Sequence, residues 1–349
     1  MRIAQVAPLY ESVPPHSYGG TERVVSYLTE ALVRQGHQVT LFASGDSRTS
    51  AELVPVVDRA LRLDGRCVDP LAHHIVQLER VAQRADEFDV IHFHVDYLHF
   101  PLVRRLKVPQ VTTLHGRLDV PDLVPLYREF GDMPVVSISD AQRAPLPHAR
   151  WQATVYNGLP EDLYRLREAP GDYLAFLGRM SPEKGVEEAI EIARRAGLPL
   201  KIAAKIDKVD QEYYTGRIRP LLRQPGIEFV GEITEREKGE FLGGALALVF
   251  PIQWPEPFGL VMTEAMACGT PVVAYPRGSV PEVVRDGENG FIVHDLESAV
   301  AALHRIREID RRRCREIFEA RFGASRMAQG YLEVYRRLVA ETYPPRLAV

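Results

Sequence analysis

The sequence predicts an α/β protein that consists of two Rossmann-like, doubly wound domains in series. Its 349 residues are enough for two domains of ordinary size. Short, continuous apolar runs alternate with amphipathic segments, which is typical of parallel strands covered by helices on both faces. The alternation starts again after a turn-rich stretch near the middle of the chain. We therefore expect two such domains facing across a cleft, with a ligand site in the crevice.

The first half begins with a strand and continues through a regular series of strands and helices. The clearest helix is expected over Glu22–Arg34, because its valines and leucines recur at three- and four-residue spacing. Further helices are expected over Leu71–Ala85 and Leu98–Leu106. The expected strands are Ile3–Ala7, Gln38–Ala43, Val90–Phe93, Gln110–Leu114 and Val135–Ile138.

The second half repeats the pattern after the turn-rich segments Tyr156–Pro160 and Arg167–Asp172. Its clearest helix is Val186–Ala196, and a closing helix is expected from about Ser325 to Val339. We place the domains at residues 1–165 and 166–325, with a closing helix and tail over 326–349. The expected strands are Tyr173–Leu177, Leu200–Ala204, Ile227–Val230, Leu246–Phe250 and Pro271–Ala274.

Composition narrows the class of protein. The net charge of −4 argues against a general nucleic-acid binder. The three cysteines are widely separated and have no metal-binding spacing, which suits a reducing compartment. The N-terminus reads as a buried strand rather than a signal peptide, and no apolar run approaches the roughly 20 residues of a membrane helix. A cytoplasmic protein is expected.

The most informative segment runs from Glu256 to Glu264. It follows an apolar strand, contains Pro257-Phe258-Gly259-Leu260, and opens a helix. A helix N-terminus after a strand offers free N–H groups and the positive end of a dipole to a phosphate. Glu256 lies in the loop and Glu264 about one turn inside the helix, so the two carboxylates can bind sugar hydroxyls on either side of that phosphate. A ligand with sugars at both ends of a pyrophosphate is a nucleotide sugar.

A second loop, Gly178–Gly185, places Arg179 and Lys184 five residues apart after an expected strand. The planar fork of arginine and the point charge of lysine together suit the spread charge of a diphosphate. Lysine is scarce in this chain, so its presence in this loop is notable. Taken alone, the loop also fits a capped helix with solvated charges.

Two loops in the first half complete the candidate site. Gly19-Gly20 permits close backbone approach to a ligand, and Thr21 is expected to cap the following helix. His115 ends a strand, at the edge where ligands bind in parallel sheets. A simple turn and a structural histidine remain the alternatives for each loop alone. All these loops lie at strand ends or helix starts, which favours one shared cleft.

Two further patterns have a plain explanation beside a functional one. His92 and His94 share one face of a strand and suggest a metal site, but core histidines are the favoured interpretation. The basic stretch Arg104–Lys107 lies beside Phe100 and leaves open a weak contact with a membrane surface, peripheral at the inner face. A solvated basic face is the favoured explanation.

At this point the chain resembles the retaining glycosyltransferases of family 4, which have the GT-B fold. The resemblance extends over nearly the whole length. The motifs that carry it are Gly19–Glu22, Val90–His94, Leu114–Gly116, Ser137–Asp140, Tyr156–Leu159, Gly178–Gly185, Glu256–Glu264, Gly269–Ala274 and Asp286–Phe291. The two acids combined with the Arg/Lys loop are the most specific of these.

The resemblance implies the role of each site residue. Arg179 and Lys184 would bind the donor diphosphate, Glu256 the transferred sugar and Glu264 the ribose hydroxyls. His115 would lie beside the reacting sugar and stabilise the transition state without acting as a nucleophile. The remaining donor contacts would come from the backbone at Gly19, Gly20, Phe258, Gly259 and Leu260, and from the base-binding segment that contains Gly231 and Ile233.

One departure from the family concerns Ala203–Asp207, where many members have glycines. Lys205 in this segment either adds a phosphate contact or closes the turn.

The predicted function is the metal-independent transfer of a hexose from a nucleotide sugar, with UDP-glucose or GDP-mannose favoured, to an acceptor hydroxyl. The acceptor, whether a small molecule, a glycan or a lipid-linked group, is not encoded in any motif. No cofactor is expected. A GT-B-shaped epimerase or phosphorylase and a non-catalytic nucleotide-sugar-binding protein are the alternatives.

Overall fold

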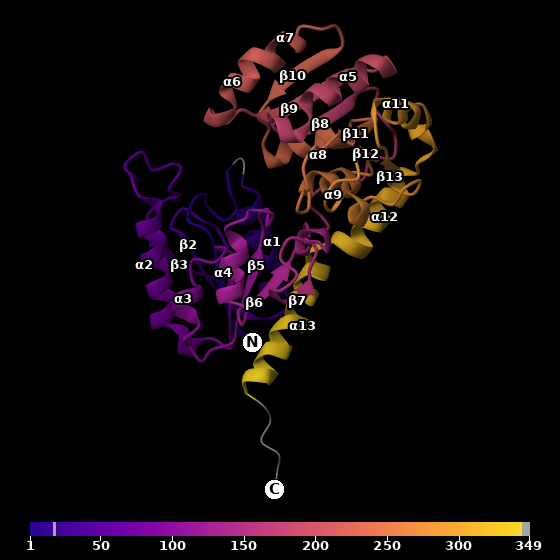
Figure 1. The fold of residues 1–349 in the computed structure, drawn as a ribbon. Coiled ribbons are helices and arrows are strands. Elements are labelled where there is room, and N and C mark those ends of the chain that lie inside the picture. The colour runs from indigo at the N-terminus through magenta and orange to yellow at the C-terminus, as the bar shows by residue number, and fades with distance from the viewer. Residues whose placement is uncertain (17–18, 344–349) are drawn as a thin grey trace. The chain divides into compact units, whose positions relative to one another are not determined.

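The structure is a computed structural model that describes residues 1–16 and 19–343. The chain divides into two compact units. Unit 1 comprises Met1–Pro160 together with Ala324–Val349, and unit 2 comprises Glu161–Gly323. The final helix therefore groups with the first unit, and unit 2 is an insertion between two parts of unit 1. Figure 1 shows this helix in yellow, although its neighbours in the sequence belong to the other unit.

Among its described residues, unit 1 contains a seven-stranded parallel sheet with the order β3-β2-β1-β4-β5-β6-β7. The strands are β1 (Arg2–Val6), β2 (Gln38–Ser44), β3 (Glu52–Val57), β4 (Val90–Phe93), β5 (Gln110–Leu114), β6 (Pro134–Ser137) and β7 (Arg150–Thr154). The helices are α1 (Gly20–Arg34), α2 (Pro70–Gln83), α3 (Phe100–Val103), α4 (Leu123–Glu129) and α13 (Ala324–Thr342), with short 3₁₀ turns at Ala85–Glu87 and Ala141–Arg143.

Helices cover this sheet on both faces. The main core joins the sheet to apolar residues of α2, α3 and α4. Helix α1 packs against α13 and contributes Val25 to a separate cluster with Leu41 of β2. The central strands β1, β4 and β5 are buried along almost their whole length, including the polar side chains of Gln5, His92 and Thr113.

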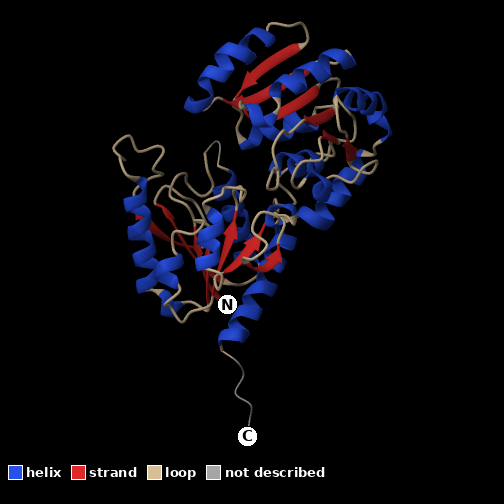
Figure 2. Ribbon diagram, in the orientation of Figure 1, coloured by secondary structure: helices blue, strands red, loops and turns tan. Residues whose placement is uncertain are grey.

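The described residues of unit 2 form a six-stranded parallel sheet with the order β10-β9-β8-β11-β12-β13, coloured red between blue helices in Figure 2. The strands are β8 (Leu174–Arg179), β9 (Leu200–Lys205), β10 (Ile227–Gly231), β11 (Ala247–Phe250), β12 (Val272–Ala274) and β13 (Gly290–Ile292). The main helices are α5 (Val186–Ala196), α8 (Glu235–Gly243), α9 (Leu260–Ala267), α10 (Val280–Val283), α11 (Leu296–Arg305) and α12 (Arg311–Phe322). Shorter turns are η3 (Pro182–Lys184), η4 (Lys208–Asp210), α6 (Gln211–Tyr213), the π-helix η5 (Tyr214–Ile218), α7 (Arg219–Leu221) and η6 (Ile306–Glu308).

One face of this sheet packs against α5 and α11, which contact each other and share the main apolar cluster. Helix α9 contacts both α8 and α12. Both sheets are parallel and flanked by helices, so the predicted pair of Rossmann-like domains is confirmed. The chain passes from unit 1 to unit 2 after Pro160 and returns to unit 1 after Gly323. The boundaries expected from the sequence were 165/166 and 325/326.

Candidate functional site

In unit 2 the site is set by the order of the strands. From the central strand β8 the chain proceeds to β9 and β10 on one side, and then to β11 on the other side of β8. The loops that leave the carboxyl ends of β8 and β11 therefore diverge, and ligands bind at such switch points in open parallel sheets. These two loops, residues 180–185 and 251–259, carry Lys184, Glu256, Phe258 and Gly259, while Arg179 is the last residue of β8 and Leu260 and Glu264 lie in α9.

The two loops are joined to each other. The N–H of Gln253 donates to the carbonyl of Glu183 at 2.9 Å. Gly185 has φ +73°, and a Cβ on it would lie 2.1 Å from the carbonyl oxygen of Pro251. Only glycine permits both that backbone angle and that close approach. The sequence thus fixes how closely the Arg/Lys loop lies to the acidic loop.

Lys184 and Glu256 meet directly where these loops join. The ammonium Nζ of Lys184 lies 2.5 Å from Oε2 of Glu256, and the side chains are only 16% and 11% exposed. The indole Nε1–H of Trp254 donates to the same carboxylate oxygen at 2.9 Å. Nζ of Lys184 also lies 5.3 Å from the centre of the Trp254 ring, within range of a cation–π interaction. Two donors therefore orient the Glu256 carboxylate.

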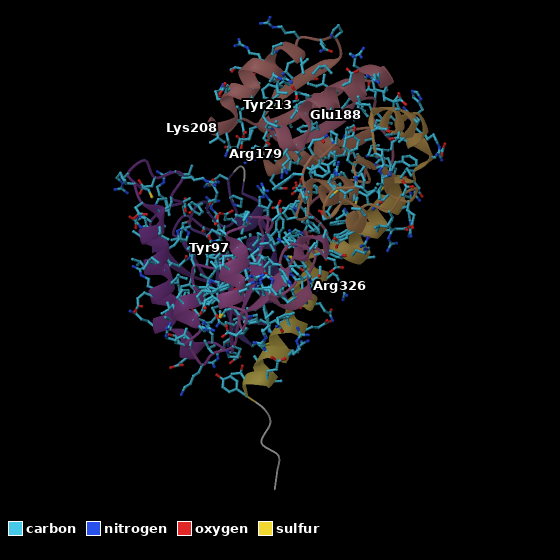
Figure 3. All side chains as sticks on the ribbon, viewed as in Figure 1. Tyr97, Arg179, Glu188, Lys208, Tyr213 and Arg326 are labelled. Atoms are coloured by element: carbon cyan, nitrogen blue, oxygen red, sulfur yellow. The ribbon has the colours of Figure 1, made fainter. Side chains whose placement is uncertain are left out.

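Arg179 is the last residue of β8 and is labelled in Figure 3. Its guanidinium forms an ion pair with Glu183 and lies 3.6 Å from Oδ2 of Asp210. Burial raises the pKa of Asp210. The cation thus lies at the carboxyl end of the central strand, held by acids that a bound diphosphate would have to outcompete.

The acidic segment leads into α9 through a left-handed residue. Gly259 has φ +74° and is the N-cap of this helix, so Leu260 is its first residue. The first N–H groups of a helix lack the partner one turn before them and can bind an anion, and the N–H of Met262 donates to the carbonyl of Gly259 at 3.0 Å. Phe258 is 2% exposed and its ring packs on Phe322, with centroids 6.0 Å apart, so its side chain belongs to the core.

Glu264 lies one turn inside α9 and is only 3% exposed. Its Oε1 accepts a hydrogen bond from Nζ of Lys238 at 2.8 Å, and Lys238 also lies 3.5 Å from Glu235. Lys238 comes from α8, the helix that directly follows Gly231 and Ile233. Gly231 ends β10 with φ +89°. The segment predicted to bind the base is thus connected through α8 to the carboxylate predicted to bind ribose.

The other predicted residues belong to unit 1. Gly19 is the N-cap of α1 and Gly20 its first residue. The prediction that Thr21 caps this helix is wrong, because Thr21 lies inside the helix and no side chain bonds at the cap. A Cβ on Gly19 would lie 2.7 Å from Cβ of Pro15, so close packing in the preceding loop requires this glycine. Ser17 and Tyr18 of the same motif lie outside the described residues.

His115 directly follows β5 and is partly exposed. Burial lowers its pKa to about 4, so the ring is neutral near pH 7. Its Nε2 lies 2.9 Å from Nδ1 of His94. His92 and His94 are 0% and 2% exposed and bond to protein groups, as expected for core histidines. The described residues contain no group of three or more His, Cys, Asp or Glu side chains arranged to hold a metal ion.

Two residues of the site were missed by reasoning from sequence alone, namely Lys238 and Trp254. Lys238 is one of only six lysines, so its rarity was a usable signal. Trp254 is one of two tryptophans and lies two residues before Glu256. Lys205 pairs with Asp207 at 3.2 Å, which fits the view that it closes the turn after β9.

Part of the basic stretch after α3 is engaged within the protein. Phe100 is fully buried, and Arg104 pairs with Asp132 and Glu129. No helix in the described part of the chain combines the length and apolar character needed to cross a membrane.

Each of the two units is matched by a model of a known protein family. The family model for glycosyl transferases group 1 matches residues 166–320, and that for Glycosyltransferase Family 4 matches residues 18–156. Glycogen synthase of Mycobacterium tuberculosis is 29% identical, with 100% of this chain and 98% of that protein covered. Alpha-maltose-1-phosphate synthase of Mycolicibacterium smegmatis is 32% identical over 48% of each chain. The crystal structure of AviGT4, a glycosyltransferase involved in avilamycin A biosynthesis, superposes with a TM-score of 0.77 at 25% identity, covering 97% of this chain and 98% of that one.

Proposed function

Since this chain belongs to the group 1 glycosyltransferases of family 4 and has their GT-B fold of two Rossmann-like units, we propose that it transfers a hexose from a nucleotide sugar to an acceptor hydroxyl. The anomeric configuration is retained and no metal ion takes part. UDP-glucose and GDP-mannose are the favoured donors, in that order. The observation that carries the proposal is the Lys184–Glu256 ion pair at the switch point, beside the N-terminus of α9.

In this proposal the diphosphate binds at the loops that follow β8 and β11. Arg179 and Lys184 neutralise it from one loop, and the N–H groups at the start of α9 bind its oxygens from the other. On binding, the diphosphate replaces Glu183 as the partner of Arg179 and shares Lys184 with Glu256. Glu256, held by Trp254, then accepts hydrogen bonds from hydroxyls of the sugar, and Glu264 accepts them from ribose.

The difficult step is the separation of charge. The bond between the sugar C1 and the diphosphate oxygen breaks, which leaves negative charge on the phosphate and positive charge on the sugar ring. Fixed cations and helix amides stabilise the leaving charge and need little reorganisation as it develops. The acceptor oxygen forms the new bond to C1, and its proton passes to the leaving phosphate. His115, neutral near pH 7, contributes to sugar binding.

Calorimetry with UDP, GDP and ADP tests the donor site first. One nucleoside diphosphate is expected to bind, and Lys184→Ala should weaken that binding by roughly tenfold to a hundredfold, as for loss of a hydrogen bond to a charged group. Lys201→Ala is the matched control, because Lys201 lies near the start of β9, is half-exposed, and contacts the exposed Glu228 at 3.2 Å and the ring of Tyr173. Absence of heat with every nucleoside diphosphate would end the proposal.

Mass spectrometry with nucleotide sugars and candidate acceptors then tests turnover. Glu256→Ala should lower kcat far more than it lowers affinity for the free nucleoside diphosphate, because Glu256 is assigned to the sugar. Inversion at C1 of the product would contradict the retaining assignment. Release of nucleoside diphosphate without any glycoside product would instead favour an epimerase.

A further inference from the structure

A continuous chain of hydrogen bonds runs through the buried interior of unit 1 and ends at His115. Nδ1 of His94 lies 2.9 Å from Nε2 of His115, and Nε2 of His94 lies 2.8 Å from Oε1 of Gln5. The amide Nε2 of Gln5 donates to the hydroxyl of Tyr335 at 3.1 Å. Gln5 and His94 are 0% and 2% exposed, so no bulk water competes for these bonds.

The series of hydrogen bonds continues from Tyr335 through His92 and Thr113 to Tyr331. The Tyr335 hydroxyl lies 2.7 Å from Nδ1 of His92, and Nε2 of His92 lies 2.7 Å from the hydroxyl of Thr113. Thr113 donates to the hydroxyl of Tyr331 at 2.8 Å. Thr113 therefore accepts from Nε2–H of His92, and Nδ1 of His92 accepts from Tyr335. The two tyrosines belong to α13, so residues of the last helix determine which groups donate and which accept in these hydrogen bonds.

These donor and acceptor assignments determine which nitrogen of His115 carries the proton. Because the amide nitrogen of Gln5 faces Tyr335, its carbonyl oxygen faces His94, and a carbonyl oxygen only accepts. His94 must place its proton on Nε2 to meet it. Burial lowers the pKa of His94 well below its ordinary value, so the ring is neutral and carries no second proton. Its Nδ1 is then an acceptor, and Nε2 of His115 has to be the donor.

We propose that Gln5 and His94 are positioning residues that hold His115 as the tautomer protonated on Nε2, which leaves its Nδ1 as a hydrogen-bond acceptor for a substrate hydroxyl. Among the described residues, no protein group bonds Nδ1 of His115. The ring is partly exposed, whereas His92 and His94 are not. Only the identity of that substrate, a sugar, rests on the proposed function; the tautomer does not.

The tautomer is read directly by nitrogen NMR of the full chain labelled with ¹⁵N-histidine at pH 7, with His115→Gln used to assign the signal. The wild-type protein should show a protonated Nε2 and a bare Nδ1 at His115. His94→Asn should preserve this state, because the amide oxygen can accept in place of Nδ1. His94→Leu offers no acceptor and should give a mixture of tautomers. A wild-type His115 protonated on Nδ1, or a His94→Leu protein with an unchanged tautomer, would overturn the proposal.

Kinetics provide a second readout. His94→Leu should lower kcat/KM by roughly tenfold, the loss expected for one misdirected hydrogen bond, and His94→Asn should recover most of it. A purely structural role would lower the melting temperature and kcat/KM together in both variants, which would count against the proposal. If no nucleotide sugar turns over, the proposed function fails while the NMR result still decides the tautomer.

Fluorinated donors test the acceptor role of Nδ1. Replacing one sugar hydroxyl at a time by fluorine removes a donated hydrogen bond, because fluorine has no proton to give. Fluorine at one position of the sugar should lower kcat/KM of the wild-type enzyme by roughly tenfold. The same substitution should not lower kcat/KM of His115→Ala any further. Equal losses in both proteins at every position would contradict the assignment.

Discussion

The ammonium group of Lys238 lies 2.8 Å from Oε1 of Glu264, and the two side chains are only 15% and 4% exposed. The pair joins α8 to α9, so a charge–charge contact sets the position of the carboxylate assigned to ribose. Removing one member of such a pair leaves the other charge uncompensated in a poorly solvated place.

Lys238→Met should therefore lower the free energy of unfolding of unit 2 by about 3 kcal/mol. The double variant Lys238→Met/Glu264→Leu should regain much of this loss, because no charge is then stranded. The chain has two tryptophans, one in each unit, so denaturation followed by Trp254 fluorescence in a Trp151→Phe background reports on unit 2 alone. Arg312→Met breaks an ion pair with Glu168, whose two side chains are 65% and 57% exposed, and it should leave the free energy of unfolding almost unchanged. Equal costs for the two single variants would refute the argument.

Trp254→Phe should weaken binding of the nucleotide sugar by roughly tenfold, because it removes the N–H that orients Glu256 and keeps most of the ring. Calorimetry with the donor and with its free diphosphate measures this, and the larger loss should appear with the donor. The matched control is Trp151→Phe in unit 1, where the indole donates to the carbonyl of Leu146 at 2.9 Å. Similar affinities for all three proteins would show that the indole does not position Glu256.

Gly278→Ala should disrupt the acidic loop. Gly278 has φ +57°, and a Cβ on it would lie 2.2 Å from the carbonyl oxygen of Glu256 and 2.4 Å from its nitrogen. Backbone cannot yield to such contacts without moving Glu256, so kcat/KM should fall by at least roughly a hundredfold, since small misplacements of a catalytic group have such effects. Gly287→Ala is the control, because Gly287 has a similar φ of +76° and open space around it. It should lose about 1 kcal/mol of stability and retain activity. Loss of activity in both variants would indicate backbone strain alone.

The stability of unit 1 should decrease as the pH is lowered from 7 to 5. Burial lowers the pKa values of His92, His94 and His99 well below the ordinary 6.5. Below pH 6.5 the unfolded chain binds protons that the folded chain does not, so the free energy of unfolding falls by about 1.4 kcal/mol per pH unit for each of these histidines. Above about pH 7.5 it should be constant with respect to these groups.

Urea unfolding followed by Trp151 fluorescence in a Trp254→Phe background measures this dependence at pH 7.5, 6 and 5. His99→Gln removes one of the three groups and should lower the slope by about a third of their combined effect. A free energy of unfolding that is unchanged or higher at pH 5 would contradict the assignment of neutral buried rings.

The sequence predicted the central strands best. The expected strands Val90–Phe93 and Gln110–Leu114 agree with β4 and β5 at both ends. The strands that it missed are β3, β7 and β13, each at the edge of its sheet. β7 has no continuous apolar run, and β13 is only three residues long. β3 is mostly exposed or half-exposed and contains Pro55, a residue that sheets accept at an edge.

The candidate site divides in the same way. Motif spacing pointed to Lys184 and Glu256, which the structure joins within 2.5 Å. It could not reveal Lys238, because the pairing with Glu264 crosses from one helix to another 26 residues away. Nor could it predict that Tyr331 and Tyr335 of the last helix bond to residues of β4 and β5. Such partners depend on how distant elements pack, and no local pattern encodes them.

The last helix also has a consequence for how the protein is made. The N–H of Ala324 donates to the carbonyl of Leu159 at 2.8 Å, so the chain leaves and re-enters unit 1 at nearly the same point. When residues 1–160 have been synthesised, unit 1 is therefore still incomplete. Its buried hydrogen-bond network lacks the hydroxyls of Tyr331 and Tyr335. Unit 2 is continuous in sequence, so it can fold before the last helix has been synthesised. The N-terminal half of the molecule is the last to acquire its native interior.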